Sequence, residues 1–453
     1  MDTVNLGRIF VINLFILIVI SANNISFSQD FDANNTSSFM DAIAKINAAP
    51  EASHKIFITG DISLETPISE AVNLELIGDT TSSEHYNFVL NGNTFTYREN
   101  KISKISDLNI VSNTSGSGFI VNQQDLTIDN ANFTSSAASN TQSSLNNIGG
   151  NLQISESNFT GNKKGMDGGA ISNQGNLETV STDFISNQGR NGGALYLSSG
   201  TANIKEADIL NNYASTYGSA AYVNNSTLTI TDSTVKDNSA MVSGGALYIE
   251  ANSNVVIDNT DFDHNTVLQQ SGGGAIYNKG NLEIKNGSSF TNNSIAGGTG
   301  GAIVNLGTLI IDNTTFDNNS VLNDGGAITG SGKLTITNSI FNNNRSTGSI
   351  AGAIINDSLE IENSIFNGNS AYSFGGAIVS SNALIKGSTF LNNESETSSG
   401  GAVVNLYGNI DFSGVSKFEN NIAGDSGGAI YATMESTTNI TGPVQFLNNK
   451  AKN

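Results

Sequence analysis

The chain has 453 residues, no cysteine, only 3 prolines and a formal net charge of −21. The lack of cysteine excludes disulfides, so a stacked core and main-chain hydrogen bonds must supply the stability. The acidic balance argues against nucleic acid or an anionic membrane surface as the main partner, and we expect no nucleic-acid partner.

Residues 1–28 are predicted to be a secretory signal peptide. Arg8 precedes an apolar run from Ile9 to Ile20, and a stretch of small polar residues follows. This run is too short and wrongly flanked for a typical spanning helix. We expect cleavage before Gln29, with an uncleaved N-terminal anchor as the alternative. The expected location is therefore secreted or on the outer cell surface, associated with the outer membrane if a partner anchors the chain.

Residues 29–54 are predicted to form an N-terminal cap. Phe39, Ile43 and Ile46 follow helical spacing, and residues 36–38 offer N-capping side chains. A helix here would cover the open edge of the first coil. Residues 55–150 contain alternating strand segments such as IFITGDISL and FIVNQ, with corners such as Asn91-Gly92. We interpret them as degenerate coils of one continuous solenoid with residues 151–453.

A repeat of about 25 residues dominates the chain after Asn130, a period typical of solenoids. Leu309 to Gly330 (LIIDNTTFDNNSVLNDGGAITG) contains its three landmarks: an apolar alternation, an FxxN motif and a GGAI cluster. The motif phenylalanines are Phe159, Phe184, Phe262, Phe290, Phe316, Phe341, Phe366, Phe390 and Phe418. The asparagines three residues later are Asn162, Asn187, Asn265, Asn293, Asn319, Asn344, Asn369, Asn393 and Asn421. The glycine pairs are Gly168-Gly169, Gly192-Gly193, Gly273-Gly274, Gly300-Gly301, Gly325-Gly326, Gly375-Gly376, Gly400-Gly401 and Gly427-Gly428.

Three short strand-like segments per repeat, without helical spacing, predict an all-β fold: a right-handed, three-sided parallel β-helix with a short N-terminal capping helix. The handedness follows from the general rule for parallel crossovers. A leucine-rich horseshoe is the rival at this period, but its regular leucines and helical arc are missing.

Stacking of equal positions gives each landmark a physical role. The phenylalanines should form an interior ring stack, and the asparagines a turn ladder, because Asn tolerates a left-handed backbone and stacked amides can bond along the axis. A shorter Asn ladder is expected at Asn259, Asn286, Asn313, Asn338 and Asn363. The glycine pairs should mark corners where either only small residues fit or φ is positive.

The interleaved GGAI and FxxN motifs resemble the repeats of chlamydial polymorphic outer membrane proteins. Ile209 and Val235 replace Phe, and Ala351 replaces the first Gly. The resemblance implies the surface passenger of an autotransporter that acts in adhesion, with a host-cell receptor or glycan as partner and the motif residues implicated. No barrel strands follow Phe446, so we expect a passenger without its barrel, a truncated gene product, or a protein whose last coil is covered by a partner or by end-to-end self-association.

The alternative function is a β-helix enzyme, a polysaccharide lyase or hydrolase, but we identify no catalytic, cofactor or metal residues. Asp258, Lys285 and Asp312 should stand side by side as an alternating-charge ladder. The segment from Asp79 to Glu99 mixes catalytic residue types: Asp79, Glu84, His85, Tyr86, Tyr97, Arg98 and Glu99. His54 and His264 are expected to be isolated and solvated.

Overall fold

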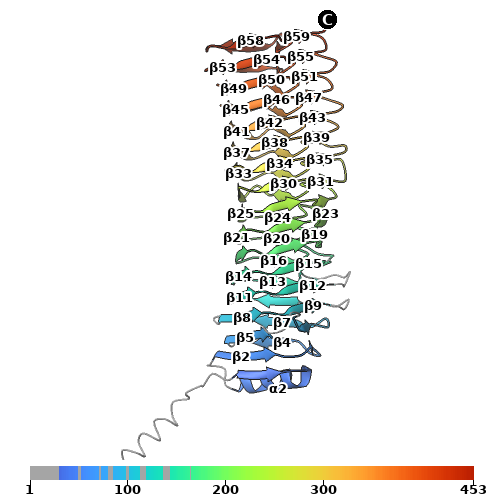
Figure 1. Ribbon diagram of the computed structural model, residues 1–453, viewed down its shortest axis with the longest axis vertical. Coiled ribbons are helices and arrows are strands. Elements are labelled where there is room, and N and C mark those ends of the chain that lie inside the picture. Colours follow the sequence, from blue (N-terminus) through green and yellow to red (C-terminus); the bar gives the residue numbers. More distant parts are fainter. Residues whose placement is uncertain are drawn as a thin grey trace, which may run out of the picture.

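The structure is a computed structural model that describes residues 30–48, 53–70, 73–79, 85–97, 102–112, 119–135, 143–163 and 165–453. The predicted signal peptide, residues 1–28, lies outside the described residues. The described strands form four parallel sheets that run along one column (Figure 1). Successive coils pair with one another, and the pairing of Asp125–Asp129 with Asn151–Ser155 carries the first of these sheets past residue 150 without a break.

Sheet 1 contains the apolar alternation of the repeat and, among the described residues, has 17 strands. They are β1 (Asp30–Ala33), β2 (Ser53–Ile58), β5 (Asn73–Gly78), β8 (Ile102–Ser106), β11 (Asp125–Asp129), β14 (Asn151–Ser155), β17 (Asn176–Val180), β21 (Gly200–Lys205), β25 (Ser226–Thr231), β29 (Asn254–Asp258), β33 (Asn281–Lys285), β37 (Thr308–Asp312), β41 (Lys333–Thr337), β45 (Leu359–Glu362), β49 (Ala383–Lys386), β53 (Gly408–Ser413) and β57 (Ser436–Ile440).

Sheet 2 contains the phenylalanine column and has 16 described strands. They are β3 (Ile62–Ser63), β6 (Asn87–Val89), β9 (Asn109–Ser112), β12 (Asn132–Ser135), β15 (Asn158–Thr160), β18 (Asp183–Ile185), β22 (Asp208–Leu210), β26 (Thr234–Lys236), β30 (Asp261–Asp263), β34 (Ser289–Thr291), β38 (Thr315–Asp317), β42 (Ile340–Asn342), β46 (Ile365–Asn367), β50 (Thr389–Leu391), β54 (Lys417–Glu419) and β58 (Gln445–Leu447).

Sheet 3 follows the glycine pairs and has 15 described strands. They are β4 (Ile68–Glu70), β7 (Thr94–Tyr97), β10 (Phe119–Asn122), β13 (Leu145–Asn147), β16 (Ile171–Asn173), β20 (Leu195–Leu197), β24 (Ala221–Val223), β28 (Leu247–Ile249), β32 (Ile276–Asn278), β36 (Ile303–Asn305), β40 (Ile328–Gly330), β44 (Ile354–Asn356), β48 (Ile378–Ser380), β52 (Val403–Asn405) and β56 (Ile430–Ala432).

Sheet 4 is a short sheet that the repeat pattern did not predict. It lies between sheets 2 and 3 in the described coils from Gln188 onward. Its 11 described strands are β19 (Gln188–Asn191), β23 (Tyr213–Tyr217), β27 (Ser239–Ala240), β31 (Thr266–Val267), β35 (Ser294–Ile295), β39 (Ser320–Val321), β43 (Arg345–Ser346), β47 (Ser370–Ala371), β51 (Glu394–Ser395), β55 (Ile422–Ala423) and β59 (Lys450–Ala451). Most have only two residues, too few to show a period-2 alternation in the sequence.

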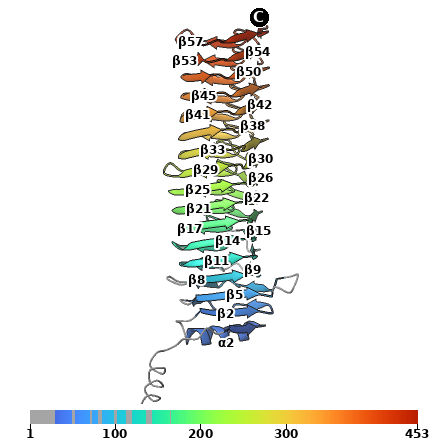
Figure 2. The ribbon, with the colours of Figure 1, turned by 60° about the vertical axis from the view of Figure 1, so that its left-hand side comes forward.

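The helix α2 (Thr36–Asn47) lies at the N-terminal end of the column, as Figures 1 and 2 show. The predicted apolar face is confirmed, because Phe39, Ile43 and Ile46 are buried. The expected N-cap among residues 36–38 is wrong: Asn35 caps the helix, and Ser38 returns the reciprocal bond of a capping box. The ring of Phe39 meets Phe88 of the coils edge-on at 5.3 Å, so the helix covers the interior.

The phenylalanine column forms the ring stack that its apolar character predicted. Phe316 and Phe341 are paired in register, and their ring centroids lie 4.7 Å apart with parallel planes. Their side chains have no exposed area. The stack is interrupted where Ile209 and Val235 replace Phe, and both of these residues are buried in the same core.

The glycine pairs combine both reasons that the sequence left open. The first glycine has a positive φ, for example +69° at Gly325, which favours glycine. The second has no space: a Cβ on Gly326 would lie 2.0 Å from the carbonyl oxygen of Gly352 in the next coil. Ala351 takes the first position with φ +61°, so that position tolerates a small side chain.

The asparagine ladder is confirmed, but its left-handed turn lies one residue earlier than expected. Asn318 and Asn343 have φ of +55° and +52°, whereas Asn319 and Asn344, which follow them, do not have a positive φ. Asn319 and Asn344 are instead fully buried and use their amides between coils. The shorter predicted ladder does hold left-handed residues, with φ of +46° at Asn313.

Candidate functional site

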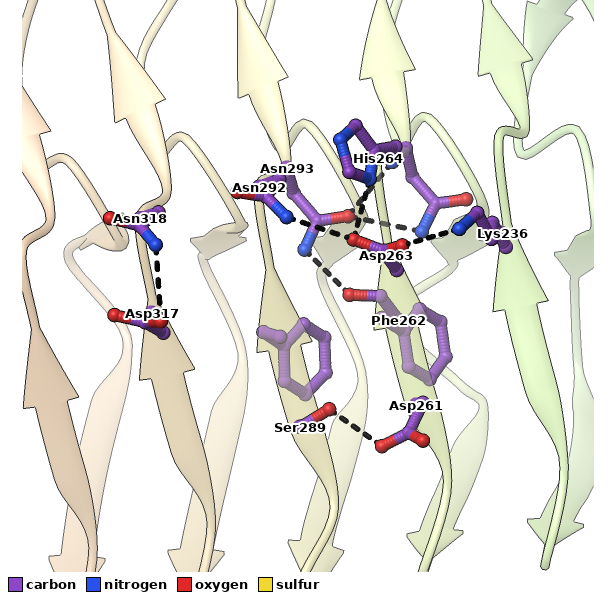
Figure 3. A network of polar contacts seen from close by, with 12 residues as sticks. Lys236, Asp261, Phe262, Asp263, His264, Ser289, Asn292, Asn293, Asp317 and Asn318 are labelled. Carbon is purple, nitrogen blue, oxygen red and sulfur yellow. Dashed lines mark hydrogen bonds and ion pairs between the residues drawn. The ribbon is translucent and has the colours of Figure 1, made fainter.

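The predicted motif residues face the interior. The motif phenylalanines and asparagines have no exposed area. Each ladder amide bonds within the coils, as Asn293 does when it donates from Nδ2 to the carbonyl oxygen of Phe262 at 2.9 Å (Figure 3). In this conformation these side chains are not accessible from the surface of the coils.

The structure also contains buried ladders that the repeat analysis missed. At the ends of the strands of sheet 3, Asn122 donates from Nδ2 to Oδ1 of Asn147 at 2.8 Å, and the same contact joins Asn278 to Asn305. A hydroxyl column precedes the phenylalanines: Ser339 donates to the carbonyl oxygen of Thr337 at 2.7 Å. The recurring Asn after GGAI and the Ser or Thr before FxxN were readable signals for both.

The predicted charge ladder on sheet 1 is wrong in its bonding. Asp258 and Lys285 are paired in register, but Lys285 bonds Glu283 of its own strand at 3.0 Å. Asp258 instead accepts from Asn286 at 2.8 Å. The left-handed turn after the strand aims this amide at the carboxylate of the preceding coil. Farther along the same column, Lys386 does bond its register neighbour Glu362 across one coil step at 2.7 Å.

The segment between Asp79 and Glu99 does not assemble the predicted residue types where it is described. Glu84, Arg98 and Glu99 lie outside the described residues. Tyr97 is fully buried on β7 with its ring 4.9 Å from Phe95, so it belongs to the core. His85 is half-buried, and its Nε2 lies 3.5 Å from Nδ2 of Asn130.

The two histidines expected to be solvated differ from that expectation. His54 on β2 is fully buried, because its position alternates with Ile56 toward the interior. His264 is exposed but not isolated: its Nδ1 lies 2.6 Å from Oδ1 of Asp263 (Figure 3).

Asp263 is the centre of a polar network on the outside of sheet 2. In addition to His264, Nζ of Lys236 lies 2.9 Å from its Oδ2, and Nδ2 of Asn292 donates to its Oδ1 at 3.1 Å. Partial burial would raise the pKa of Asp263, but the hydrogen bonds from Lys236, Asn292 and His264 outweigh it, so the pKa lies below its ordinary value. The network therefore stabilises the carboxylate form.

An aromatic stack on the outside of sheet 3 is the most distinctive outward-facing feature of the coils. Tyr196, Tyr222, Tyr248 and Tyr277 occupy the same position of consecutive strands and form what we call the tyrosine stack. Their neighbouring ring centroids lie 5.5, 5.5 and 5.1 Å apart with interplanar angles of 8° or less. Tyr217 of β23 packs beside Tyr248 at 4.5 Å.

Charged side chains fix the C-terminal half of this stack. The hydroxyl of Tyr222 donates to Oε1 of Glu250 at 2.9 Å, and Nζ of Lys279 lies 3.3 Å from Oε2 of the same carboxylate. Lys279 also lies 5.0 Å from the Tyr248 ring centroid, in cation–π range. Burial and the bond to Glu250 raise the pKa of Tyr222, so its hydroxyl stays protonated.

A cavity of about 220 Å³ opens at the N-terminal end of the tyrosine stack. Tyr196 forms one wall, and Ser172, Asn146, Gln174 and Asp167 are among the polar residues that line it. The carboxylate of Asp167 is held by two bonds from Arg190, at 2.9 and 2.8 Å. The pKa of Tyr196 is raised, mainly by burial of its hydroxyl and to a smaller extent by the negative charge of Asp167.

A second hollow of about 460 Å³ lies on the outer face of sheet 1. Its floor is a polar ladder in which Asn151 donates to Asp125 at 2.6 Å, Asn176 to Asn151 at 2.8 Å and Thr201 to Asn176 at 2.9 Å. The polar groups of these side chains are hydrogen-bonded to one another. No group of three or more potential metal-ligating His, Cys, Asp or Glu side chains occurs in the part of the chain that the structure describes.

No helix of the described ranges is both long and apolar enough to cross a bilayer. No curated protein matches the chain. Among solved structures, the chain is similar to a tailspike protein of bacteriophage CBA120, with 13% identity and a TM-score of 0.40 over 93% of this chain, and it spans 59% of the tailspike's length.

Two further similarities are to polysaccharide-active proteins. One is the A-module of a mannuronan C-5 epimerase of Azotobacter vinelandii, with 11% identity and a TM-score of 0.28 over 93% of this chain and 96% of that one. The other is the catalytic domain of an α-1,3-glucanase, with 12% identity and a TM-score of 0.29 over 93% of this chain and 69% of that one. Nothing about the activity of this chain follows from similarities this distant.

Two family models match the chain. The right-handed β-helix region matches residues 219–375, and the Chlamydia polymorphic membrane protein repeat matches residues 416–433. The second match contains Phe418, Asn421, Gly427 and Gly428, the residue types on which the resemblance was based. The chain is therefore a right-handed parallel β-helix protein that carries the polymorphic membrane protein repeat.

Proposed function

We propose that this protein is a surface-exposed or secreted adhesin, an interaction scaffold that resembles an autotransporter passenger and has no catalytic role. The supporting observation is the division of labour within each coil. The repeated Phe, Asn and Gly residues pack and bond within the coils, while the outward positions of paired strands hold different residues from coil to coil.

This arrangement suits the display of binding residues. Outward neighbours on sheet 1 include Gln153, Glu178, Asn203 and Thr229, and their backbone positions are fixed by the paired strands beneath them. Binding residues on a rigid framework lose little conformational freedom when a partner docks. A host-cell receptor or glycan is the partner we propose. Nucleic acid is disfavoured by the net charge of −21.

Adhesion can be tested with beads coated with the full chain and offered to cultured host-type cells. Beads coated with an unrelated β-helix protein of similar net charge serve as the control. We expect bead attachment that free protein competes away. Attachment equal to the control would contradict the adhesin proposal, and cleavage of any polysaccharide in a parallel panel would favour the enzymatic alternative.

A further inference from the structure

The tyrosine stack ends abruptly, and the way it ends creates a binding site. In the register of sheet 3, Tyr196 pairs with Tyr222 on one side and with Ser172 on the other. One face of the Tyr196 ring is covered by Tyr222 at 5.5 Å. Because Ser172 is small, no ring of the described residues stacks on the opposite face of Tyr196, and that face forms a wall of the 220 Å³ cavity.

The two ends of the tyrosine stack differ. At the C-terminal end Tyr277 pairs with Val304, a branched apolar residue that is itself buried and continues the column. At the N-terminal end the column continues as Ser172 and then Asn146, both polar. The position next to Tyr196 in the preceding coil therefore lacks a ring and leaves an open space. One coil step along the axis measures about 4.8 Å.

The cavity wall combines an aromatic face with polar groups held in place. Asp167 is fixed by both bonds from Arg190 and by the backbone N–H of Asn191 at 3.1 Å. Its side chain is 17% exposed, so the carboxylate still reaches the cavity surface. Ser172 and Gln174 add a hydroxyl and an amide, and Ile148 and Met166 supply apolar surface at the edge.

This combination matches the chemistry of a sugar ring. A pyranose has a face of C–H groups that packs on an aromatic ring and a rim of hydroxyls that donate to carboxylates and exchange hydrogen bonds with amides. The volume of about 220 Å³ is below the roughly 300 Å³ at which sites for drug-sized ligands begin, so it fits one ring rather than an extended chain. The net charge of −21 and Asp167 at the wall favour a neutral sugar over an acidic one.

We propose that the cavity beside Tyr196 binds one neutral saccharide unit, which stacks on the free face of Tyr196 as the next ring of the column and is hydrogen-bonded by Asp167, Ser172 and Gln174. This inference rests on the proposed function, because it names a glycan as the class of surface molecule that the scaffold contacts. Arg190 is a positioning residue that holds Asp167 in place.

The first test is saturation-transfer NMR on the full chain with the methyl glycosides of glucose, galactose, mannose and N-acetylglucosamine. We expect transfer to the C–H protons of at least one glycoside. Ser172→Tyr fills the space with a side chain and should abolish the signal, and Tyr196→Ala should weaken binding by about tenfold or more, equivalent to about 1.4 kcal/mol. Ile355→Tyr, which adds a ring in the same column away from the cavity, should bind like wild type.

Melting temperatures of the three variants confirm that each is folded. Absence of transfer from every glycoside, or undiminished binding by folded Ser172→Tyr, overturns the site. N-acetyl-tyrosine amide tests an aromatic partner, and its preferential binding at this cavity also overturns the saccharide assignment. If no glycoside binds but wild-type beads attach to cells, the site fails while the adhesin proposal stands. If the glycoside binds but wild-type beads do not attach, the adhesin proposal fails while the site stands.

Discussion

The side-chain amide of Asn344 donates from Nδ2 to Oδ1 of Asn369 at 3.0 Å, across one coil step. The same Nδ2 donates to the carbonyl oxygen of Phe316 at 3.0 Å. Its Oδ1 accepts from the backbone N–H and from Nδ2 of Asn319, at 3.1 and 2.9 Å. All donors and acceptors of this buried amide are therefore satisfied, and no other side chain offers this pattern in the same volume.

Asn344→Asp should be strongly destabilising although the two side chains have nearly the same shape. The substitution removes both N–H donors and places a carboxylate against Oδ1 of Asn369 and the Phe316 carbonyl oxygen. We expect the free energy of unfolding to fall by about 3 kcal/mol or more. Denaturant unfolding measures it. Asn343→Asp, at the exposed neighbouring residue, is the matched control and should change stability by less than about 1 kcal/mol. Equal losses would refute the role assigned to the ladder amide.

Phe316→Ala should lower the free energy of unfolding by about 3–5 kcal/mol, because it removes a fully buried ring from the centre of the stack. Phe446→Ala provides the comparison, since Phe446 is 47% exposed and has Phe418 as its stacking neighbour at 5.1 Å. Phe446→Ala should lower the stability clearly less than Phe316→Ala, and thermal unfolding of the two variants measures the difference. An unchanged melting temperature for Phe316→Ala together with weaker adhesion would mean that the ring acts in recognition instead.

The two glycines of one corner should respond differently to alanine. Gly325→Ala should cost about 1–2 kcal/mol, the strain of a left-handed non-glycine residue. Its Cβ would lie 2.4 Å from the carbonyl oxygen of Ile328, but Ala351 at the same position shows that the backbone can shift to relieve this contact. Gly326→Ala places its Cβ 2.0 Å from the backbone carbonyl oxygen of Gly352, so the coils must separate locally. We expect a larger loss for this variant in calorimetry. The opposite ranking would be inconsistent with the corner geometry.

Asp263 should contribute a pH-dependent part of the stability. Its pKa is lowered in the folded protein, so its contribution is fully present above the unfolded value of about 3.9 and disappears as the pH falls through the folded pKa. Asp263→Asn should therefore be less stable than wild type at pH 7, and the difference should vanish in strongly acidic buffer. Urea unfolding at a series of pH values measures the gap. A gap that persists below the folded pKa would mean that packing, not charge, is lost.

The sequence predicted features that recur at a fixed spacing and missed those that depend on contacts between coils. Phe316, Asn319 and Gly325 are periodic landmarks, and their interior placement followed from stacking alone. The left-handed turn was assigned to Asn319, yet it lies at Asn318, because both residues are asparagine and only the backbone distinguishes their roles. Lys285 was expected to pair with its register neighbour Asp258, but its flexible side chain reaches Glu283 instead.

The candidate binding site was harder to predict than the fold. The tyrosines stand one residue after Leu195, Ala221, Leu247 and Ile276, inside segments first interpreted as strands. Their alignment became visible only with the coil register. The cavity depends further on Asp167 and Arg190, which belong to successive turns and meet through side-chain geometry that no periodicity encodes.

The carbonyl groups of the asparagine ladder all point the same way. In each coil Oδ1 accepts from the preceding coil, as Asn344 does from Asn319 and Asn369 does from Asn344. The ladder therefore has a direction, and its first Oδ1, that of Asn162, accepts from the hydroxyl of Ser144 at 2.7 Å. The first amide, Asn162, lies inside the column, and earlier coils and helix α2 separate it from the N-terminal tip, so a second copy cannot continue the ladder at that end. The ladder therefore gives the rod an internal direction along its axis without making the two tips of the rod alike or complementary.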